Sequence, residues 1–439
     1  MSVAAEHDPL EAAAVVPPAA RPASLPWTLG FLTLISAFNY LDRSLLGLLL
    51  PLIKQDLRLS DTALGLIAGL AFGLVYALLS LPIARLADRH NRRNIVAIGF
   101  AFWSLMTALT GYVVNGVQMA LCRLLMGAGE AAGLAPSQSM IADGVKEERR
   151  PLALAIFSTA AALDALFLLP LAAWVASQYG WRAAFQLAGF AGLLLAILFF
   201  LTVREPVRAA SARTSSTGSK SLLAACAILC RSKVFLAIMA GGGFMGGALY
   251  GVATWMSTLL HRVHGLSIME IGLYVTPLRG ILGIVGIVGA GWLVQHLARG
   301  DAGWRFRGPA IIAAALACAY PFLLLSDLTF VWMTALVVTA LLYSAHQGPL
   351  FDATIALAPP DMRATAVAIK VLVSGLLGQI VGPLAVGGLT DLLAPHHGEQ
   401  AIRYSMLAVV FCCIAGAALF FLAERLAAAE AASGASAGQ

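Results

Sequence analysis

The chain has 439 residues, of which 60% are hydrophobic and 11% charged, and its formal net charge is +6. Soluble proteins of this length carry about a quarter charged residues, so the composition excludes an ordinary soluble domain. It indicates an integral membrane protein, in which a basic excess is explained by loops at the membrane surface and requires no nucleic acid partner.

Apolar stretches long enough to cross a hydrocarbon core about 30 Å thick as helices recur along nearly the whole chain. In chain order we predict spans at 27–51, 62–84, 94–114, 116–142, 151–178, 182–203, 233–260, 268–298, 308–326, 329–357, 361–393 and 401–427. The expected fold class is therefore all-α integral membrane, with twelve transmembrane helices.

The segments outside these spans divide the chain. Residues 1–26, rich in Ala and Pro, lack the compact apolar segment of a signal peptide and are predicted to be a disordered cytoplasmic tail. The polar segment 204–232, with "REPVRAASARTSSTGSKS", is predicted to be a cytoplasmic linker. It would join an N-terminal six-helix bundle at 27–203 to a C-terminal six-helix bundle at 233–427, and 428–439 would be a cytoplasmic tail.

Orientation follows from the basic residues. With both termini on one side, most of the 28 Lys and Arg residues fall on that side, and basic loops tend to stay in the cytoplasm. We expect a multi-pass protein of a bacterial cytoplasmic (inner) membrane with both termini inside. Two pseudo-symmetric halves around a midplane site are a common design of secondary transporters.

Ionisable residues inside the predicted spans are few. The stretch "FNYLDRSLLG" places Asp42 and Arg43 in span one, span four carries Arg123 and Glu130, and span five carries Asp164. Intramembrane charges are rare and usually functional. Arg123 and Glu130 are seven residues apart and therefore share a helix face. Asp42 is expected at a depth similar to that of Arg123, which predicts a single polar seam.

Such a seam suits proton coupling. A carboxyl group beside an arginine stays ionised, whereas one surrounded by apolar helices can gain and lose a proton. Protonation would release the arginine and change the favoured helix packing. The alternative is a static pair between spans one and four, although a buried ion pair stabilises weakly. Asp164 is either a second titrating site or a hydrogen-bonded core acid.

The loop "ARLADRHNRR" between spans two and three is predicted to be a cytoplasmic gate. Its residues are Arg85, Asp88, Arg89, Arg92 and Arg93, with Asp143 from the end of span four. Asp88 could cap a helix N-terminus of the other half, and Asp143 could pair with Arg85 or Arg92. The simpler interpretation is a basic loop held at the membrane surface.

Candidate substrate contacts lie on both halves. Arg279 and Lys370 could bind a phosphate or carboxylate, and Phe157, Tyr250, Trp255 and Tyr343 could line an apolar surface. Plain packing is the alternative for these aromatic residues. It is also the alternative to a hinge for the glycines of span seven, because small residues let membrane helices approach closely.

Twelve spans in two sixes, with "ARLADRHNRR" between spans two and three, resemble the major facilitator superfamily. The family signature in this loop is G-x-x-x-D-[RK]-x-G-x-[RK]-[RK]. Here Ala84 and Asn91 replace its two glycines, and Asn91 is expected to adopt the left-handed conformation. The corresponding segment of the second half has Gln295 in place of the acid, so a symmetrical gate is not expected.

Within that superfamily, "NYLDR" and "RLLMGAGEAAGLAPSQSMIAD" resemble the Spinster group of lysolipid and sphingolipid transporters. The resemblance implies proton-driven alternating access, with roles for Asp42, Arg123 and Glu130. It implies a lysolipid or sphingolipid-like substrate and a proton gradient as the energy source. We expect no cofactor and no metal, and a monomer in the lipid bilayer.

Two other functions remain open or disfavoured. Openings like "NYLDR" also occur in anion symporters, so a carrier of small organic anions or hydrophobic drugs is the alternative. A membrane-embedded lipid enzyme is disfavoured, because the sequence contains no H-E-x-x-H helix and no other recognisable catalytic constellation.

Overall fold

The structure, a computed structural model, describes residues 25–206, 222–359 and 362–437, and its regular elements in these ranges are helices. They group into twelve membrane-crossing segments, six on each side of the linker. Nine helical segments of the described chain are long and apolar enough to cross a membrane. The last of these joins two crossings, and α1 and the α5 and α6 pair complete the predicted twelve.

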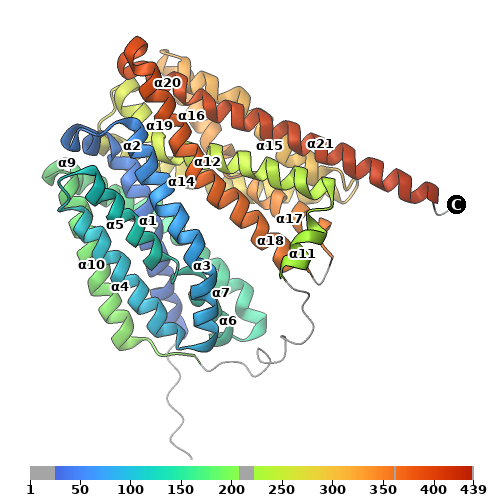
Figure 1. Ribbon diagram of the computed structural model, residues 1–439, viewed down its shortest axis with the longest axis horizontal. Helices are drawn as coiled ribbons and strands as arrows, with labels where there is room; N and C mark the ends of the chain where they lie inside the picture. The colour runs from blue at the N-terminus through green and yellow to red at the C-terminus, as the bar shows by residue number, and fades with distance from the viewer. Residues whose placement is uncertain (1–24, 207–221, 360–361, 438–439) are drawn as a thin grey trace, which may run out of the picture.

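The N-terminal bundle is coloured blue to green in Figure 1. It consists of α1 (Leu25–Leu57), α2 (Asp61–Gly65), η1 (Leu66–Ala71), α3 (Phe72–Arg89), α4 (Arg92–Thr110), α5 (Gly116–Glu130), α6 (Leu134–Gly144), η2 (Glu147–Arg149), α7 (Arg150–Ser158), α8 (Ala160–Leu163), η3 (Asp164–Leu168), α9 (Leu169–Tyr179) and α10 (Trp181–Thr202).

The C-terminal bundle follows a short helix, α11 (Leu222–Leu229), and is coloured yellow-green to red. It consists of α12 (Lys233–His264), α13 (Ile268–Glu270), η5 (Ile271–Val275), α14 (Thr276–Ala298), α15 (Trp304–Leu325), α16 (Thr329–Leu342), α17 (Gln347–Leu357), α18 (Arg363–Leu372), η7 (Val373–Leu377), α19 (Gly378–His397), η8 (Gly398–Gln400), α20 (Ala401–Ser405) and α21 (Leu407–Ala437).

Side-chain caps begin many of these helices. Ser60, Asn91, Asn115 and Ser232 accept hydrogen bonds from backbone N–H groups in the first turns of α2, α4, α5 and α12. Ser267 forms a reciprocal capping box with Glu270 at the start of α13. These polar residues satisfy N–H groups that a helix start leaves without partners. They therefore explain why the crossings begin where they do.

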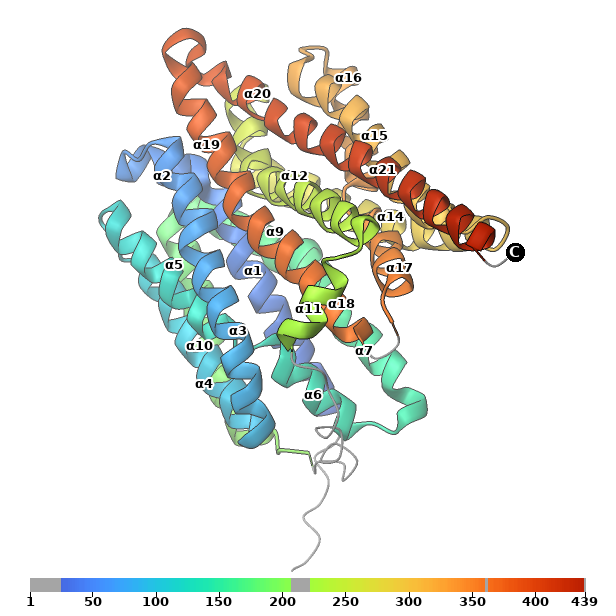
Figure 2. The same ribbon diagram turned by 45° about the vertical axis from the view of Figure 1, so that its right-hand side comes forward.

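The two bundles meet at one end of the molecule. Between them, α1 packs on α12, α2 and η1 pack on α19, and α9 packs on α13 and η5. Figures 1 and 2 show the bundles diverging from α2 and α19 toward α7 and α18. We call the first end, with Asp61 and Asp391, the closed end. The second, with Arg92 and Asp143, is the linker end.

Glycines permit the closest approach between the bundles. A Cβ atom added at Gly65 of α2 would lie 2.6 Å from the backbone oxygen of Pro383 in α19. One added at Gly387 of α19 would collide with the backbone of Asp61. A larger residue at either position would force the bundles apart, since backbone atoms have nowhere to move.

Irregular backbone recurs at matching places in the two halves. Span two, span five, span eight and span eleven each contain one π-helical turn, namely η1, η3, η5 and η7. Each of these turns contacts the opposite bundle. Spans four and ten are interrupted, at residues 131–133 and 343–346. Non-helical backbone at membrane depth is tolerated where it is buried in protein or lines a cavity.

Several predicted boundaries need correction. The first helix begins at Leu25, and the rest of the predicted disordered tail lies outside the described residues. Helix α11 forms within the predicted linker 204–232, because its sequence "LLAACAIL" is strongly apolar. The last helix continues through the predicted tail to Ala437 on a run of alanines with high helix propensity.

Candidate functional site

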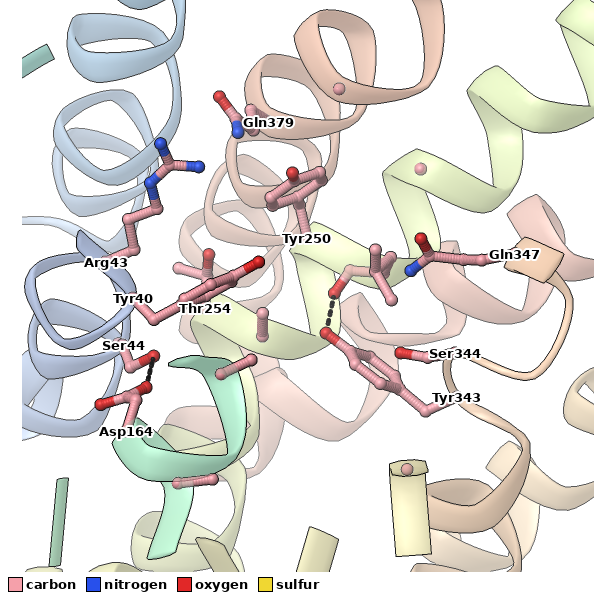
Figure 3. Close-up of a pocket in the computed structure, with 18 of the residues that line it drawn as sticks. Tyr40, Arg43, Ser44, Asp164, Tyr250, Thr254, Tyr343, Ser344, Gln347 and Gln379 are labelled. Carbon is pink, nitrogen blue, oxygen red and sulfur yellow. Dashed lines mark hydrogen bonds between the residues drawn. The ribbon is translucent and has the colours of Figure 1, made fainter. Parts of the chain in front are cut away.

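A cavity of about 640 Å³ lies between the two bundles. Figure 3 shows polar side chains that line it: Tyr40, Arg43 and Ser44 from α1, Asp164 from η3, and Tyr250, Thr254, Tyr343, Ser344, Gln347 and Gln379 from the C-terminal bundle. Both halves therefore contribute to one polar site, which we call the central cavity.

Arg43 and Glu130 form an ion pair at the wall of the N-terminal bundle. Arg43 Nη2 lies 2.9 Å from Glu130 Oε2, and the side chain of Glu130 is fully buried. Asn39 Nδ2 donates to the same oxygen at 2.8 Å. Asn39 and Arg43 are four residues apart and share one face of α1. Sequence reasoning missed Asn39, although its spacing from Arg43 was a usable signal.

Two aromatic rings hold the Arg43 guanidinium. Its central carbon lies 4.9 Å from the ring centre of Phe72 and 4.8 Å from that of Tyr76. Such cation–π contacts favour a cation even where water is scarce. Arg43 also lines the central cavity. It therefore links the buried carboxyl of Glu130 to the cavity.

Asp42 and Arg123 lie in the same buried seam, but their side chains are not paired. Arg123 Nη1 donates to the main-chain oxygen of Asp42 at 3.0 Å. The carboxyl of Asp42 instead accepts from Thr107 Oγ1 at 2.9 Å. The predicted seam of Asp42, Arg123 and Glu130 is present, and it includes Thr107, which the sequence did not single out.

Asp164 belongs to the wall of the central cavity. Its Oδ2 accepts from Ser44 Oγ at 2.9 Å, and its Oδ1 has no hydrogen-bond partner among the described residues. Figure 3 shows this pair on the N-terminal side of the cavity. The residue is thus hydrogen-bonded, as one prediction held. It also retains an unpartnered oxygen, as a titrating site would.

The wall of the C-terminal bundle is basic. The Arg279 guanidinium lies 5.1 Å from the ring centre of Tyr343, and Lys370 Nζ lies 3.6 Å from that of Phe351. Within residues 25–206, 222–359 and 362–437, neither cation forms an ion pair with a carboxylate. His346, at the break in span ten, is buried and leaves its Nδ1 without a partner in that part of the chain.

Two of the four aromatic residues predicted to contact substrate line the central cavity. Tyr250 and Tyr343 line the central cavity, and the Tyr343 hydroxyl donates to the main-chain oxygen of Leu249 at 2.9 Å. Trp255 is fully buried and donates to Pro383 O, so it packs α12 on α19. Phe157 lies in the core and borders a smaller cavity. Helix periodicity predicts which face of a helix a residue occupies but not how deeply neighbouring helices bury it, so the sequence did not separate these two residues from those that line the central cavity.

The closed end carries a polar cluster that sequence reasoning missed. Asp61 of α2 forms two hydrogen bonds with Arg262 of α12, at 2.8 and 3.0 Å, and one with Lys54. Asp391 of α19 accepts from the backbone N–H groups of Asp61 and Thr62, at 3.0 and 2.7 Å. A carboxylate at a helix start is favourable, and here it comes from the opposite bundle. We call these residues the closed-end latch.

The predicted gate lies at the linker end. Arg92 pairs with Asp143 at 2.5 Å, as the sequence suggested, and with Glu205 at 2.7 Å. The main-chain N–H of Arg93 also donates to Glu205. These contacts all lie within the N-terminal bundle. The other three gate candidates, Arg85, Asp88 and Arg89, are exposed there.

Asn91 does not take the predicted left-handed conformation. Its φ is −68° and its side chain accepts from the N–H of Asn94, so it caps α4. A cap of this kind is what asparagine provides and glycine does not.

Known proteins resemble this chain over most of its length. Residues 32–383 match the sequence profile described as Major Facilitator Superfamily. An MFS-type efflux pump of Mycolicibacterium smegmatis is 32% identical over 403 residues, covering 90% of this chain and 91% of that protein. A probable galactarate/D-glucarate transporter of Bacillus subtilis is 24% identical over 411 residues, covering 88% of this chain and 90% of that protein.

A solved structure has the same fold. The crystal structure of a bacterial homolog to the human lysosomal transporter Spinster, inward-facing and unoccupied, matches with a TM-score of 0.83 at 25% identity. The match covers 93% of this chain and 98% of that one. Since the profile spans most of both bundles and the architecture agrees, the chain is a multi-pass membrane transporter that belongs to the major facilitator superfamily.

Proposed function

We propose that this protein is a proton-coupled secondary transporter of an amphiphilic organic anion, a lysolipid or sphingolipid-like molecule with a phosphate or carboxylate head. The observation that carries the proposal is the pair of basic side chains, Arg279 and Lys370, which border the central cavity without a carboxylate partner in the described chain. A buried cation is costly unless an anion compensates it. A bound anionic head would supply that compensation.

Apolar surface beside these cations supports a substrate with a hydrocarbon part. Residues that could contact such a part line the same cavity: Leu46, Phe72, Leu169, Ile284, Ile287 and Leu350. A volume of about 640 Å³ is in the range of cavities that hold molecules of drug or lipid-head size. The solved structure with the same fold is that of a bacterial homolog to the human lysosomal transporter Spinster.

Proton coupling is assigned to the opposite wall. Glu130, Asp42 and Asp164 lie in the N-terminal bundle, whereas the two cations lie in the C-terminal bundle. Protonation of Glu130 would neutralise the charge that holds Arg43 at the cavity wall. Because Arg43 belongs to the first helix of the moving bundle, its release would change which packing of the bundles is favoured.

The conformation fits alternating access. The closed-end latch joins the bundles on one side, and the polar contacts of the predicted gate stay within the N-terminal bundle on the other. We assign the linker end to the cytoplasm of a bacterial inner membrane, with both termini inside, because most basic residues lie at that end. The conformation would then be inward-facing, and the protein would work as a monomer.

A second candidate is transport of small sugar acids. It is favoured by hydroxyl and amide groups beside the cations, including Ser344, Gln347 and Gln379. A polyhydroxy acid could use such groups, and one relative is named as a probable galactarate/D-glucarate transporter.

The test is transport by purified protein in proteoliposomes with an imposed proton gradient. One arm supplies a lysophospholipid, a second a sphingoid phosphate and a third galactarate. We expect saturable, gradient-dependent movement of a lipid. Counterflow with galactarate alone would establish the second candidate, and lipid movement that ignores the gradient would reject proton coupling.

A further inference from the structure

A second, smaller cavity lies inside the N-terminal bundle. It has a volume of about 70 Å³ and is bordered by α1, α3, α4, α6 and α7. Its polar lining includes Ser36, Asn39, Tyr76, Trp103 and Ser137. We call it the inner chamber. Nothing in the proposed transport of an anion requires a polar chamber at this place.

Two side chains separate the inner chamber from the central cavity. Tyr40 and Arg43 of α1 line both of them. Arg43 is held there by its ion pair with Glu130 and by the rings of Phe72 and Tyr76. The partition is therefore built on the same residue that contacts the buried acid.

Unpartnered polar atoms indicate what fills the chamber. Trp103 Nε1, on a fully buried side chain that lines the chamber, has no hydrogen-bond partner in the described chain. Glu130 Oε1 is likewise buried and unpartnered there, while its other oxygen binds two lining residues, Asn39 and Arg43. Buried polar groups are satisfied by protein or by ordered water. The volume exceeds the roughly 10–15 Å³ that one water molecule requires.

The lining of the chamber continues from Asn39 and Arg43, which bind Glu130, toward the linker end. Ser36 precedes Asn39 by about one helical turn, and Ser137 follows Glu130 on α6. Both directions lead to the end that carries Arg92 and Asp143. Water in this chamber would therefore approach Glu130 from that side without passing through the central cavity.

We propose that the inner chamber is a hydrated proton-access site for Glu130, separate from the path of the substrate. A hydronium ion in the chamber transfers one proton to the Glu130 carboxylate, which leaves a water molecule and a neutral carboxylic acid. The ion pair with Arg43 is then lost. This inference rests on the proposed proton coupling. It adds the route by which the proton reaches Glu130 and the side chains that separate this route from the central cavity.

Charged and titratable groups around Glu130 are consistent with a one-way approach. Those near it are Asp42 and Arg43 from α1 and Arg123 from its own helix, and Tyr76 from α3 lies against Arg43. The cation of Arg43 stands at the partition, and like charges repel strongly where water is scarce. A hydronium ion is therefore disfavoured beyond Arg43. Coupling would fail if protons leaked into the substrate path.

The experiment compares two transport modes in proteoliposomes. Substrate counterflow without a gradient requires no net proton movement, whereas uptake driven by a proton gradient does, and an internal pH dye reports the proton flux. Ser36→Leu would fill the chamber, and Trp103→Phe would remove the unpartnered N–H. Both should slow proton-driven uptake about tenfold or more, a loss of roughly 1.4 kcal/mol in transition-state terms, with counterflow within about twofold of the unmodified protein.

The matched control is Ser158→Leu, which makes the same substitution at an exposed position beside the chamber residue Phe157. It should leave both modes unchanged. Unaltered proton coupling in Ser36→Leu and Trp103→Phe would overturn the proposal, and so would equal losses of both modes in Trp103→Phe. If the unmodified protein showed no coupled proton flux, the proposed function itself would fail.

A structural measurement gives an independent answer. A structure resolved well enough to place solvent should contain ordered water between Trp103 Nε1 and Glu130 Oε1. A dry chamber would contradict the inference.

Discussion

At the scale of single residues, Arg43 links the buried carboxyl of Glu130 to both cavities. It binds Glu130, lies against two aromatic rings and borders both cavities. Removing one partner of a buried ion pair typically costs about 3–5 kcal/mol, since the other charge remains buried. A change in the charge of Glu130 is therefore large enough to alter how the two bundles pack.

Replacing Glu130 with glutamine tests this role. Glu130→Gln keeps a hydrogen-bond acceptor for Asn39 and Arg43 but cannot exchange a proton. Uptake driven by a proton gradient should fall about tenfold or more, the remaining uptake should no longer vary with pH, and counterflow should persist. Initial rates across a pH series measure this, with exposed Glu399→Gln as the control. A pH response like that of the unmodified protein would contradict the assignment.

Replacing Lys370 tests the anion site. Hydrogen bonds to charged groups contribute about 1.5–3 kcal/mol, so Lys370→Ala should weaken binding of an anionic substrate by about tenfold to a hundredfold. Lys370→Arg should retain most of the affinity because it keeps the charge. Binding to purified protein measures the effect, and exposed Lys233→Ala is the control. Equal weakening of a neutral substrate would show that Lys370 acts on packing instead.

The sequence predicted where the buried charged residues lie better than it predicted their partners. Asp42, Arg123 and Glu130 were expected in one seam and lie in one. Adjacent residues on a helix point about 100° apart, so whether Asp42 or Arg43 faces span four depends on the rotation of α1 about its axis. That rotation is set by packing with neighbouring helices, chiefly α12, α8 and α10, which spacing in one sequence does not contain. The hydrogen bonds of Asn39 to Glu130 and of Thr107 to Asp42 were not predicted for the same reason.

At the scale of helices, two breaks in the crossings lie next to buried titratable side chains. Glu130 is the last residue before the break in span four, and His346 is the last residue of the break in span ten. Both breaks lie in stretches whose length and mean hydropathy predict a single span. Alanine at residues 131 and 132 favours a helix locally, so the break depends on tertiary contacts. Sequence reasoning therefore predicted two unbroken spans and missed these places.

The closed-end latch gives a prediction for helix α2. Asp391→Asn removes the carboxylate that caps this helix from the other bundle. Charge-assisted hydrogen bonds and the helix dipole together are worth about 1–3 kcal/mol. The closed end should then open in a larger share of molecules, by about tenfold. Spin labels at Gln55 and His396, in a protein without its native cysteines, should report a longer distance.

A matched control lies at the same end of the molecule. Asp327 pairs with Arg403 inside the C-terminal bundle. This hydrogen bond lowers the pKa of Asp327, which keeps the carboxylate charged at neutral pH. Asp327→Asn therefore removes an equal charge without touching the contact between bundles, and the label distance should stay unchanged. Equal lengthening in both variants would reject the latch.

At the scale of the whole molecule, the charged residues of the central site are divided between the two bundles. The acids of the central site belong to the N-terminal bundle, whereas Arg279 and Lys370, which have no carboxylate partner among the described residues, belong to the C-terminal bundle. Twelve crossings in two bundles were predictable because hydropathy alone specifies them. The extent of contact between the bundles was not predictable from the sequence, because it depends on matching surfaces such as Gly65 against Pro383.

This contact surface provides the last prediction. Gly65→Ala places a methyl group 2.6 Å from a backbone oxygen of the opposite bundle, so the bundles must separate. We expect a longer distance between labels at Gln55 and His396 and turnover several-fold slower. Gly289→Ala is the control, because nothing lies within 4 Å of the added atom. Unchanged distance and turnover in Gly65→Ala would show that the contact between the bundles tolerates the methyl group.

The length of the final helix has a practical consequence. Helix α21 has 31 residues and so extends about 46 Å, more than the roughly 30 Å of a hydrocarbon core. Figure 1 shows its end projecting beyond the other helices. Because this end is continuous with the last crossing, a rotation of that crossing would displace it further than a residue inside the bundle. If the bundles rock as proposed, a fluorophore at Ala429 would move further than one inside the bundle, which would make the motion easier to observe in single molecules.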